Sequence, residues 1–354
     1  NQVEFVASGT LPNGKPVILK ADGTVEVIGI SAGLAHGASS VFETPGPAGW
    51  TSVAMLTSTK AIVVYIDAAG SGYTTAVVLE ISGSTITAGT PFQYDGDSDN
   101  VDVVMLTSTK VLSTWRSGSL SNQGLATVLL ISGTTISKGS DVVFETNYLQ
   151  DSSLARLSST QAIVCYRDHG GTNYGTSCII SVSGSTTVTV GTPAVFESAS
   201  TYDVSVATFS STKAIVCYQD AGNGSYLTAR ILSISGSSVS AGTEIVFANS
   251  ASTLPLVDVL SSTKAIVVFS DQGNSYYGTS RILDISGTTI SITGNATVYD
   301  SSQSRDNVVA ALSATEAVVT YRDGNNKGSY SKLSVSGVTI TATTPTIFLD
   351  SYIN

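Results

Sequence analysis

The run Ala214-Ile-Val-Cys-Tyr218 decides the fold, because nearly the same five residues return along the chain about every fifty positions. Close copies stand at 61–65, 162–166 and 265–269. A fixed period of this length is the sequence signature of a repeat architecture. The aromatic residues that close the run in successive repeats are Tyr65, Trp115, Tyr166, Tyr218, Phe269 and Tyr321.

Each repeat contains four short segments of strand character. Five apolar, β-branched residues are too few for a helix and favour a buried strand. In the unit from Val204 to Phe247, four such segments alternate with turns rich in Ser, Gly and Asn, and the last segment is broken by Ala241-Gly-Thr243. Four strands in about fifty residues are typical of one propeller blade. The sequence therefore predicts an all-β propeller with four antiparallel strands per blade.

The number of blades depends on how the N-terminal segment is interpreted. Six repeats are clear, and residues 1–45 supply shorter segments that match a divergent seventh, with Lys15 to Lys20 as its second strand. Terminal repeats of such arrays are usually atypical. We predict a seven-bladed propeller, with six blades as the alternative, and a single domain over residues 1–354.

Composition excludes two classes of partner. Lys and Arg total 16 against 26 Asp and Glu, for a formal charge of −10. Nucleic acid requires a basic surface, so we expect no nucleic-acid partner. No apolar stretch approaches the roughly 20 residues of a spanning helix, so we expect no membrane insertion. Low charge with abundant Ser, Thr and Gly indicates an extracellular or virion protein.

The three cysteines form no framework. Cys165 and Cys217 stand where other repeats carry Val64, Val268 and Thr320, so we interpret them as small core residues. A disulfide between Cys165 and Cys178 is the alternative for that pair, although directly opposed strand cysteines rarely have the required geometry. Neither a metal spacing nor a cofactor motif is present, so we expect no cofactor.

These repeats resemble β-propeller repeats of bacterial surface proteins and of bacteriophage tail-fibre and other virion proteins. The opening segment from Ala7 to Val25 is especially similar to phage structural proteins. The architecture also resembles that of seven-bladed bacterial propeller lectins. The resemblance implies a propeller over essentially the whole chain, and it implies little about activity, because propellers serve as enzymes, lectins and scaffolds alike.

The two faces of the predicted ring differ in sequence. First turns such as Thr57 to Lys60 and third turns such as Ser82 to Ser84 are nearly constant, which indicates a structural role. Second-turn loops and the connections between repeats vary, and they are rich in aromatic, Asp and Asn residues suited to sugars or protein partners. Our candidate ligand-binding residues on this variable face are Trp50, Tyr94, Tyr148, Tyr202, Asp168, His169, Tyr174, Asp271, Tyr276 and Tyr299.

Two features of the variable face have competing interpretations. The Asp-to-Tyr spacing of Asp168/Tyr174 recurs in other repeats, which favours a hairpin-capping device over ligand binding. The segment with Asp95, Asp97 and Asp99 opens like a calcium loop. It departs from that pattern at Asn100 and Leu106, so a solvated acidic loop is favoured and Ca²⁺ is the alternative.

The sequence therefore predicts a non-catalytic recognition module of a virion appendage or cell surface. Its partner would be a glycan or a protein receptor. A purely structural domain with interfaces to sister subunits is the second interpretation. The third is a glycan-active hydrolase, because Asp151, Asp203 and Asp306 share one repeat position and could form a central acidic site.

Overall fold

The computed structural model describes residues 6–7, 17–19, 24–27, 41–42, 48–68 and 72–350, in two compact units, Asn1–Ala38 and Ser39–Asn354. In the first unit, β1 (Val6–Ala7), β2 (Val17–Leu19) and β3 (Thr24–Val27) form a sheet of order β1-β3-β2. The β1–β3 pair is parallel. This order differs from the antiparallel succession expected of a blade, so a seventh blade is not confirmed and stays a prediction.

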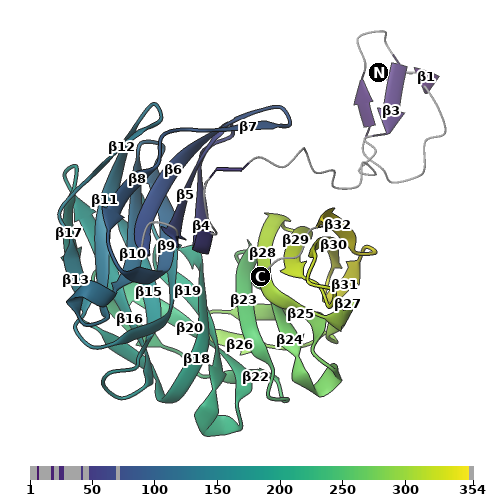
Figure 1. Ribbon diagram of the computed structural model, residues 1–354. Helices are drawn as coiled ribbons and strands as arrows, with labels where there is room; N and C mark the ends of the chain where they lie inside the picture. The colour runs from purple at the N-terminus through teal and green to yellow at the C-terminus, as the bar shows by residue number, and fades with distance from the viewer. Residues whose placement is uncertain are drawn as a thin grey trace, which may run out of the picture. The chain divides into compact units, whose positions relative to one another are not determined.

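The second unit repeats one strand pattern six times (Figure 1). Repeats 1 and 2 comprise β4 (Ala48–Thr57), β5 (Lys60–Asp67), β6 (Tyr73–Ser82), β7 (Thr85–Ala88), β8 (Phe92–Asp95), β9 (Ser98–Thr107), β10 (Lys110–Ser117), β11 (Gln123–Ser132), β12 (Thr135–Lys138) and β13 (Val142–Glu145). Repeats 3 and 4 comprise β14 (Leu149–Arg156), β15 (Gln161–Asp168), β16 (Tyr174–Ser183), β17 (Thr187–Val190), β18 (Ala194–Ser210), β19 (Lys213–Asp220), β20 (Tyr226–Ser235), β21 (Ser238–Ala241) and β22 (Ile245–Ala248). Repeats 5 and 6 comprise β23 (Thr253–Ser261), β24 (Lys264–Asp271), β25 (Tyr277–Ser286), β26 (Thr289–Ser291), β27 (Thr297–Gln303), β28 (Arg305–Ser313), β29 (Glu316–Arg322), β30 (Gly328–Ser336), β31 (Thr339–Ala342) and β32 (Thr346–Leu349).

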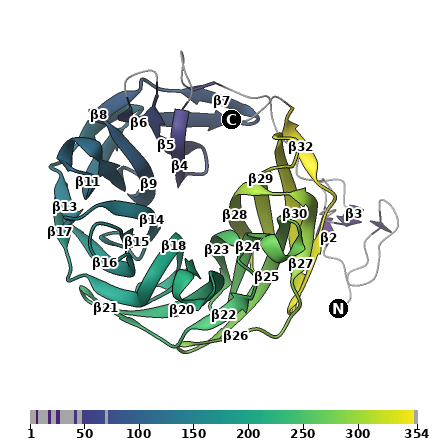
Figure 2. The same cartoon turned by 60° about the horizontal axis from the view of Figure 1, so that its bottom comes forward.

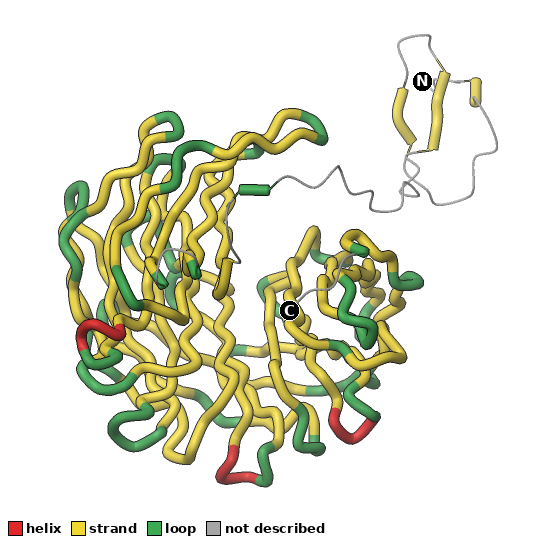
Figure 3. The backbone as a smooth tube through the Cα atoms, in the orientation of Figure 1, coloured by secondary structure: helices red, strands yellow, loops and turns green. Residues whose placement is uncertain are grey.

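The topology is that of a β-propeller. Repeats 1, 2, 5 and 6 are separate five-stranded sheets, and the long β18 joins repeats 3 and 4 into one nine-stranded sheet. The fourth strand is broken as expected, because both β21 and β22 pair with β20. Figure 2 shows β9, β14, β18, β23 and β28 innermost in an array around a central axis. Among the described residues the only helices are the 3-10 turns η1 (Gly118–Leu120), η2 (Ala221–Asn223) and η3 (Gln272–Asn274) (Figure 3), so the all-β prediction is confirmed.

The closing aromatics join consecutive repeats through the core. From repeat 2 onward, each packs against an aromatic from the outer strand of the repeat before it, as Trp115 does on Tyr94 with ring centroids 5.4 Å apart. Tyr218 meets Phe196 at 5.3 Å in the same way. The series also includes Phe144–Tyr166, Phe247–Phe269 and Tyr299–Tyr321. In repeat 1, Tyr65 packs on Phe42, which lies before the first strand of that repeat. The period in the sequence is therefore the spacing of one interface between sheets.

The constant turns are constant because they interlock. Lys60 Nζ, in the first turn of repeat 1, donates to the Gly133 carbonyl in the third turn of repeat 2, at 2.9 Å. Lys110 Nζ donates to Gly184 O in the same way, at 2.7 Å. The first turns of repeats 1 and 2 thus hold the third turns of repeats 2 and 3, which supports a structural role for this face.

The two ends of the series are less covered than its interior. Val53 in repeat 1 is 62% exposed, whereas Val257, its equivalent in repeat 5, is 7% exposed. Phe348 in repeat 6 is 39% exposed, whereas its equivalent Phe247 is 1% exposed. Within the described part of the chain, these two ends present apolar side chains that interior repeats bury against a neighbour.

The cysteines are buried and free, so the core interpretation holds for all three. Cys165 pairs with Ser177 across the hairpin and Cys178 pairs with Val164. Because side chains alternate between the faces of a strand, this one-residue offset places Cys165 and Cys178 on opposite faces of the sheet. A disulfide between them is thereby excluded.

Candidate ligand-binding site

The inner strand of every repeat bends at one equivalent position. The register between inner and second strands shifts there, as between Gln150 and Ser153 in repeat 3. The residue at the bend has a positive φ in all six repeats: Trp50 (40°), Asn100 (52°), Asp151 (48°), Asp203 (51°), Leu254 (54°) and Asp306 (50°). Left-handed backbone is unfavourable for bulky side chains such as Trp and Leu. Such β-bulges re-aim side chains beside functional sites.

The six bends line one pocket of about 220 Å³. Its wall is completed by Ser152, Val204, Pro255, Leu256 and Asn307. These residues belong to the inner strands where they leave the connections between repeats, so the pocket opens beside the variable loops. We call it the central pocket. It gathers Trp50, one of our candidates, with the three aspartates that we expected to form a central acidic site.

Backbone amides hold the side chains of Asn100 and Asp203 in place. When the Asn100 amide is oriented to satisfy its neighbours, its side-chain oxygen accepts from the amides of Asp151 and Ser152 at 3.1 and 3.2 Å. Asp203 Oδ2 accepts from the amide of Leu254 at 3.0 Å. The bends at Asn100 and Asp203 therefore bind the next repeat through their side chains. Leu254 interrupts this series in repeat 5.

Burial raises the pKa of Asp203 above its ordinary value, against the lowering effect of the Leu254 amide and Arg167. Burial also raises the pKa of Asp151, and the Asp203 carboxylate adds to that rise. Arg167 Nε lies 3.1 Å from Asp151 Oδ2, and Arg322 Nε lies 3.0 Å from Asp306 Oδ2. The pocket thus offers anionic acceptors that are only partly neutralised.

Trp50 and Asn307 give the central pocket two further recognition groups. The Trp50 side chain is 63% exposed, which leaves its ring open to stacking. Asn307 is buried, and its Oδ1 accepts from the Tyr299 hydroxyl at 2.9 Å. Its buried Nδ2 has no partner within the described residues. An aromatic plane beside carboxylate and amide groups is a suitable surface for a sugar.

Asp168, His169 and Tyr148 form one loop cluster. Asp168 Oδ1 accepts from the amide of Gly171 at 3.0 Å and from Asn147 Nδ2 at 3.1 Å. The His169 ring packs edge-on to Tyr148, with centroids 5.0 Å apart, and the Arg116 guanidinium lies 4.6 Å from the Tyr148 ring centroid. Tyr174 is half-buried at the start of β16. Asp168 thus caps its loop, as the hairpin-capping interpretation predicts.

The remaining loop candidates lie at other repeats. Asp271 Oδ1 accepts from the Gly273 amide at 3.0 Å, which is again a capping contact. Tyr276 is exposed, with its hydroxyl accepting from Gln272 at 2.9 Å. The exposed Tyr202 ring lies under Arg167, 4.3 Å from the guanidinium carbon. Of these residues Tyr202 and Tyr276 present open aromatic surface.

Tyr94 and Tyr299 require correction, because both are buried in the core. Tyr94 packs on Trp115 and its hydroxyl lies 2.8 Å from Ser113 Oγ. Tyr299 packs on Tyr321. Both are the outer-strand aromatics of their repeats, a position that carries Phe in other repeats. The sequence interpretation placed both on the variable connections between repeats, whereas the structure places them in the outer strands β8 and β27.

The acidic segment after β8 does not gather its carboxylates. Asp95 accepts from Trp115 Nε1 and from Ser98, and Asp99 is ion-paired with Arg116. Asp97 occupies a tight turn with φ of 48°. Within the described residues, the carboxylates that lie within 4.8 Å of one another are those of Glu197, Asp220 and Glu244 instead. Calcium at Asp95, Asp97 and Asp99 stays a prediction that this geometry does not support.

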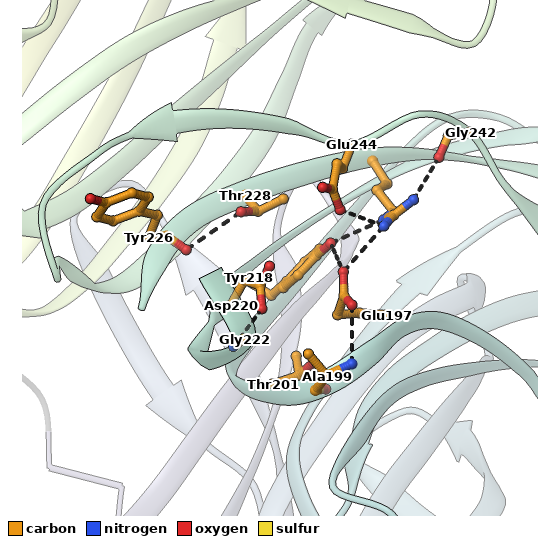
Figure 4. A network of polar contacts seen from close by, with 11 residues as sticks. Glu197, Ala199, Thr201, Tyr218, Asp220, Gly222, Tyr226, Thr228, Gly242 and Glu244 are labelled. Carbon is orange, nitrogen blue, oxygen red and sulfur yellow. Dashed lines mark hydrogen bonds and ion pairs between the residues drawn. The ribbon is translucent and has the colours of Figure 1, made fainter. Parts of the chain in front are cut away.

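The Glu197, Asp220 and Glu244 group is occupied by an arginine (Figure 4). Arg230 Nη2 contacts Glu197 at 3.2 Å and Glu244 at 2.5 Å, and its Nε donates to the Tyr218 hydroxyl at 3.0 Å. The Arg230 guanidinium already pairs with Glu197 and Glu244, while Asp220 accepts from the Gly222 amide, so the group serves as a structural network. Sequence reasoning missed Arg230 because its acidic partners are distant along the chain.

Comparison with known proteins shows the fold of the chain, but neither its family nor its activity. No protein-family model and no curated protein matches the chain. AofleA from Arthrobotrys oligospora is 10% identical over 87% of this chain and 90% of its own, with a TM-score of 0.53. The SapL1 lectin, solved with alpha methyl fucoside, is 12% identical over 86% and 96%, with a TM-score of 0.52. An alpha-L-arabinanase from Penicillium chrysogenum, complexed with arabinobiose, is 13% identical over 82% and 94%, with a TM-score of 0.50.

These structures support a propeller arrangement for this chain, and they include both a lectin and a glycan hydrolase. They do not extend to the expected resemblance to phage tail fibres, which stays a prediction. Among the described residues no helix is long and apolar enough to cross a membrane.

Proposed function

We propose that this chain is a non-catalytic recognition module of a cell surface or virion, and that it binds a glycan in the central pocket. The observation that carries the proposal is that an exposed tryptophan shares one pocket with Asn100, Asp151, Asp203 and Asp306. Stacking on Trp50 would bind the apolar face of a sugar ring, and the carboxylates and amides would bind its hydroxyl groups. The similarity in fold to the SapL1 lectin is consistent with this function.

A glycan array compared between the wild type and Trp50→Ala tests the proposal. We expect the wild type to bind a restricted set of glycans, and Trp50→Ala to lose at least about tenfold in affinity, by analogy with nucleobase stacking on aromatics, which is worth about 1–3 kcal/mol. Tyr73→Ala is the matched control, because Tyr73 is an exposed aromatic of the same repeat outside the pocket. An array without binding, or equal losses in both variants, would overturn the proposal.

A glycan hydrolase is the second candidate, favoured by the raised pKa values of Asp151 and Asp203 in a shared pocket. A carboxylic acid with a raised pKa can act as the general acid, with a second carboxylate as base or nucleophile. Release of reducing ends from any bound glycan, abolished in Asp151→Asn and Asp203→Asn, would establish the hydrolase. Stable binding without product over long incubation would support the recognition module.

A further inference from the structure

Repeats 4 and 5 carry an arginine at the same place in their third strands. Arg230 on β20 stands opposite Val216, and Arg281 on β25 stands opposite Val267. The other four repeats have Val77, Thr127, Cys178 and Ser331 at this position. The two arginines therefore allow a direct comparison of one backbone position in two environments.

In repeat 4 the arginine is satisfied. Its guanidinium contacts Glu197, Glu244 and the Tyr218 hydroxyl, and Nη1 donates to Gly242 O at 3.1 Å (Figure 4). Two carboxylates and a phenol thus surround one positive charge. This is the arrangement expected of a charged group removed from water.

In repeat 5 all three of these partners are absent. The register places Ala248 where repeat 4 has Glu197, Ala296 where it has Glu244, and Phe269 where it has Tyr218. Arg281 Nη1 donates to the Phe247 carbonyl. Its buried Nε has no partner, and within the described part of the chain no carboxylate forms an ion pair with Arg281.

The removal of the acids leaves a pocket of about 250 Å³ at Arg281. We call it the Arg281 pocket. Its wall combines the apolar Phe247, Ala248, Phe269 and Ala296 with the polar Asn249, Ser250, Asp271 and Asn274. Pockets for drug-sized ligands begin at about 300 Å³, so this volume suits one sugar ring or one side chain.

The electrostatics of the Arg281 pocket favour an anion. Burial lowers the pKa of Arg281, and Asp271 opposes that shift only in part. The Asp271 Oδ1 atom is already engaged by Ser250 Oγ at 2.9 Å and by the Gly273 amide at 3.0 Å. A partly buried charge that Asp271 compensates only in part is costly, and a bound carboxylate would offset this cost.

We propose that the Arg281 pocket binds the carboxylate of an acidic saccharide, which takes the place that Glu197 and Glu244 occupy around Arg230. Asn249, Ser250 and Asn274 provide amide and hydroxyl groups for the sugar hydroxyls. The anion site stands on the comparison of repeats 4 and 5 alone. The choice of a saccharide rests on the proposed glycan-binding function.

The test is an NMR titration of the whole chain with methyl glucuronide and with the neutral methyl glucoside. We expect the glucuronide to shift the amides of Asn249, Ser250 and Asn274, and the glucoside to bind at least about tenfold more weakly. Arg281→Gln should abolish the glucuronide shifts. Ala248→Glu should abolish them as well, because it restores the internal carboxylate of repeat 4, and it should not lower the Tm.

Trp50→Ala separates this inference from the proposed function, because it alters only the central pocket. Glucuronide binding that survives Trp50→Ala and disappears in Arg281→Gln supports the Arg281 pocket. Binding that survives Arg281→Gln overturns it. Equal binding of acetate, or binding of a glutamate-containing peptide in place of the glucuronide, overturns the saccharide assignment. Neutral glycans that bind at Trp50 without any anion at Arg281 would overturn this inference and leave the proposed function intact.

Discussion

At the scale of single residues, the closing aromatics combine packing with a polar anchor. The Trp115 ring is fully buried against Tyr94, and its Nε1 donates to Asp95. The Tyr218 hydroxyl donates to Glu197 at 2.9 Å. One side chain thereby fixes both the distance between two sheets and the start of the connection between them.

Trp115→Ala should lower the free energy of unfolding by about 3–5 kcal/mol, because it opens a large cavity and removes one of the two donors to the Asp95 carboxylate. Urea unfolding followed by circular dichroism measures this loss. Trp50→Ala is the control, and it should cost less than about 0.5 kcal/mol, since Trp50 is exposed. Similar losses in the two variants would contradict this account.

Asp203 should make stability fall as the pH rises. Its folded-state pKa is raised by burial, so the folded state binds the proton more tightly than the unfolded state does. The resulting stabilisation is complete below the ordinary value of 3.8 and is lost as the pH rises through the folded-state pKa. Asp203→Asn keeps an acceptor for the Leu254 amide, as Asn100 does for its own neighbour in repeat 2. Urea unfolding measured between acidic and neutral pH should show the free energy of unfolding of the variant rising relative to that of the wild type as the pH rises. If this difference between the two proteins does not change with pH, the assignment to Asp203 is refuted.

At the scale of elements, two kinds of glycine shape the outer strands. Gly184, in the third turn of repeat 3, has a φ of +59° and open space around a Cβ. Gly191 breaks the fourth strand of the same repeat, where a Cβ would lie 2.4 Å from the Ser237 carbonyl oxygen of the next repeat. The first glycine serves its own turn, and the second allows a neighbouring sheet to approach.

Gly191→Ala should therefore destabilise more than Gly184→Ala. An alanine at Gly184 destabilises the protein only through left-handed backbone strain, by about 1 kcal/mol. An alanine at Gly191 must displace backbone of the adjacent repeat, which costs about 3 kcal/mol by comparison with overpacked cores. Denaturation midpoints of the two variants, measured side by side, give the order. A larger effect at Gly184 would mean that the two sheets can separate locally without cost.

The strands and turns were predictable from sequence because alternation and turn residues are local signals. The division of the fourth strand at Gly242 was visible for the same reason. The bend of the inner strands was not visible, because residues of four different types, from Trp50 to Asp306, adopt one backbone conformation. The central acidic site was inferred from equivalent positions, whereas the Arg281 pocket needed the three-dimensional neighbours Ala248 and Ala296.

At the scale of the whole molecule, the described sheets form a series with an interior and two ends. Neighbouring inner strands contact one another from β4 through β28. Phe196 is buried at the joint between repeats 3 and 4, whereas Phe348 at the end of the series is partly exposed. The stability of such an array is approximately the sum of the intrinsic stabilities of its repeats and the interaction energies between neighbouring repeats.

Phe196→Ala should cost about 3–5 kcal/mol, and Phe348→Ala less than half as much, because only the first residue closes an interface between described repeats. The comparison uses the same substitution at equivalent positions, measured by urea unfolding. An equal cost at Phe348 would show that something outside the described repeats covers the end of the series.

The bends around the central pocket have a consequence for valence. The same backbone bend recurs in all six repeats, but the bends carry tryptophan, asparagine, leucine and three aspartates. The backbone around the central pocket is therefore repeated, whereas the side chains that line the pocket are not. A pocket lined by identical side chains would accept a ligand in several equivalent orientations, whereas the unlike side chains of the central pocket make these orientations inequivalent. Under the proposed function, each chain would hold one oriented ligand in the central pocket, and strong attachment to a surface would come from the number of chains displayed together.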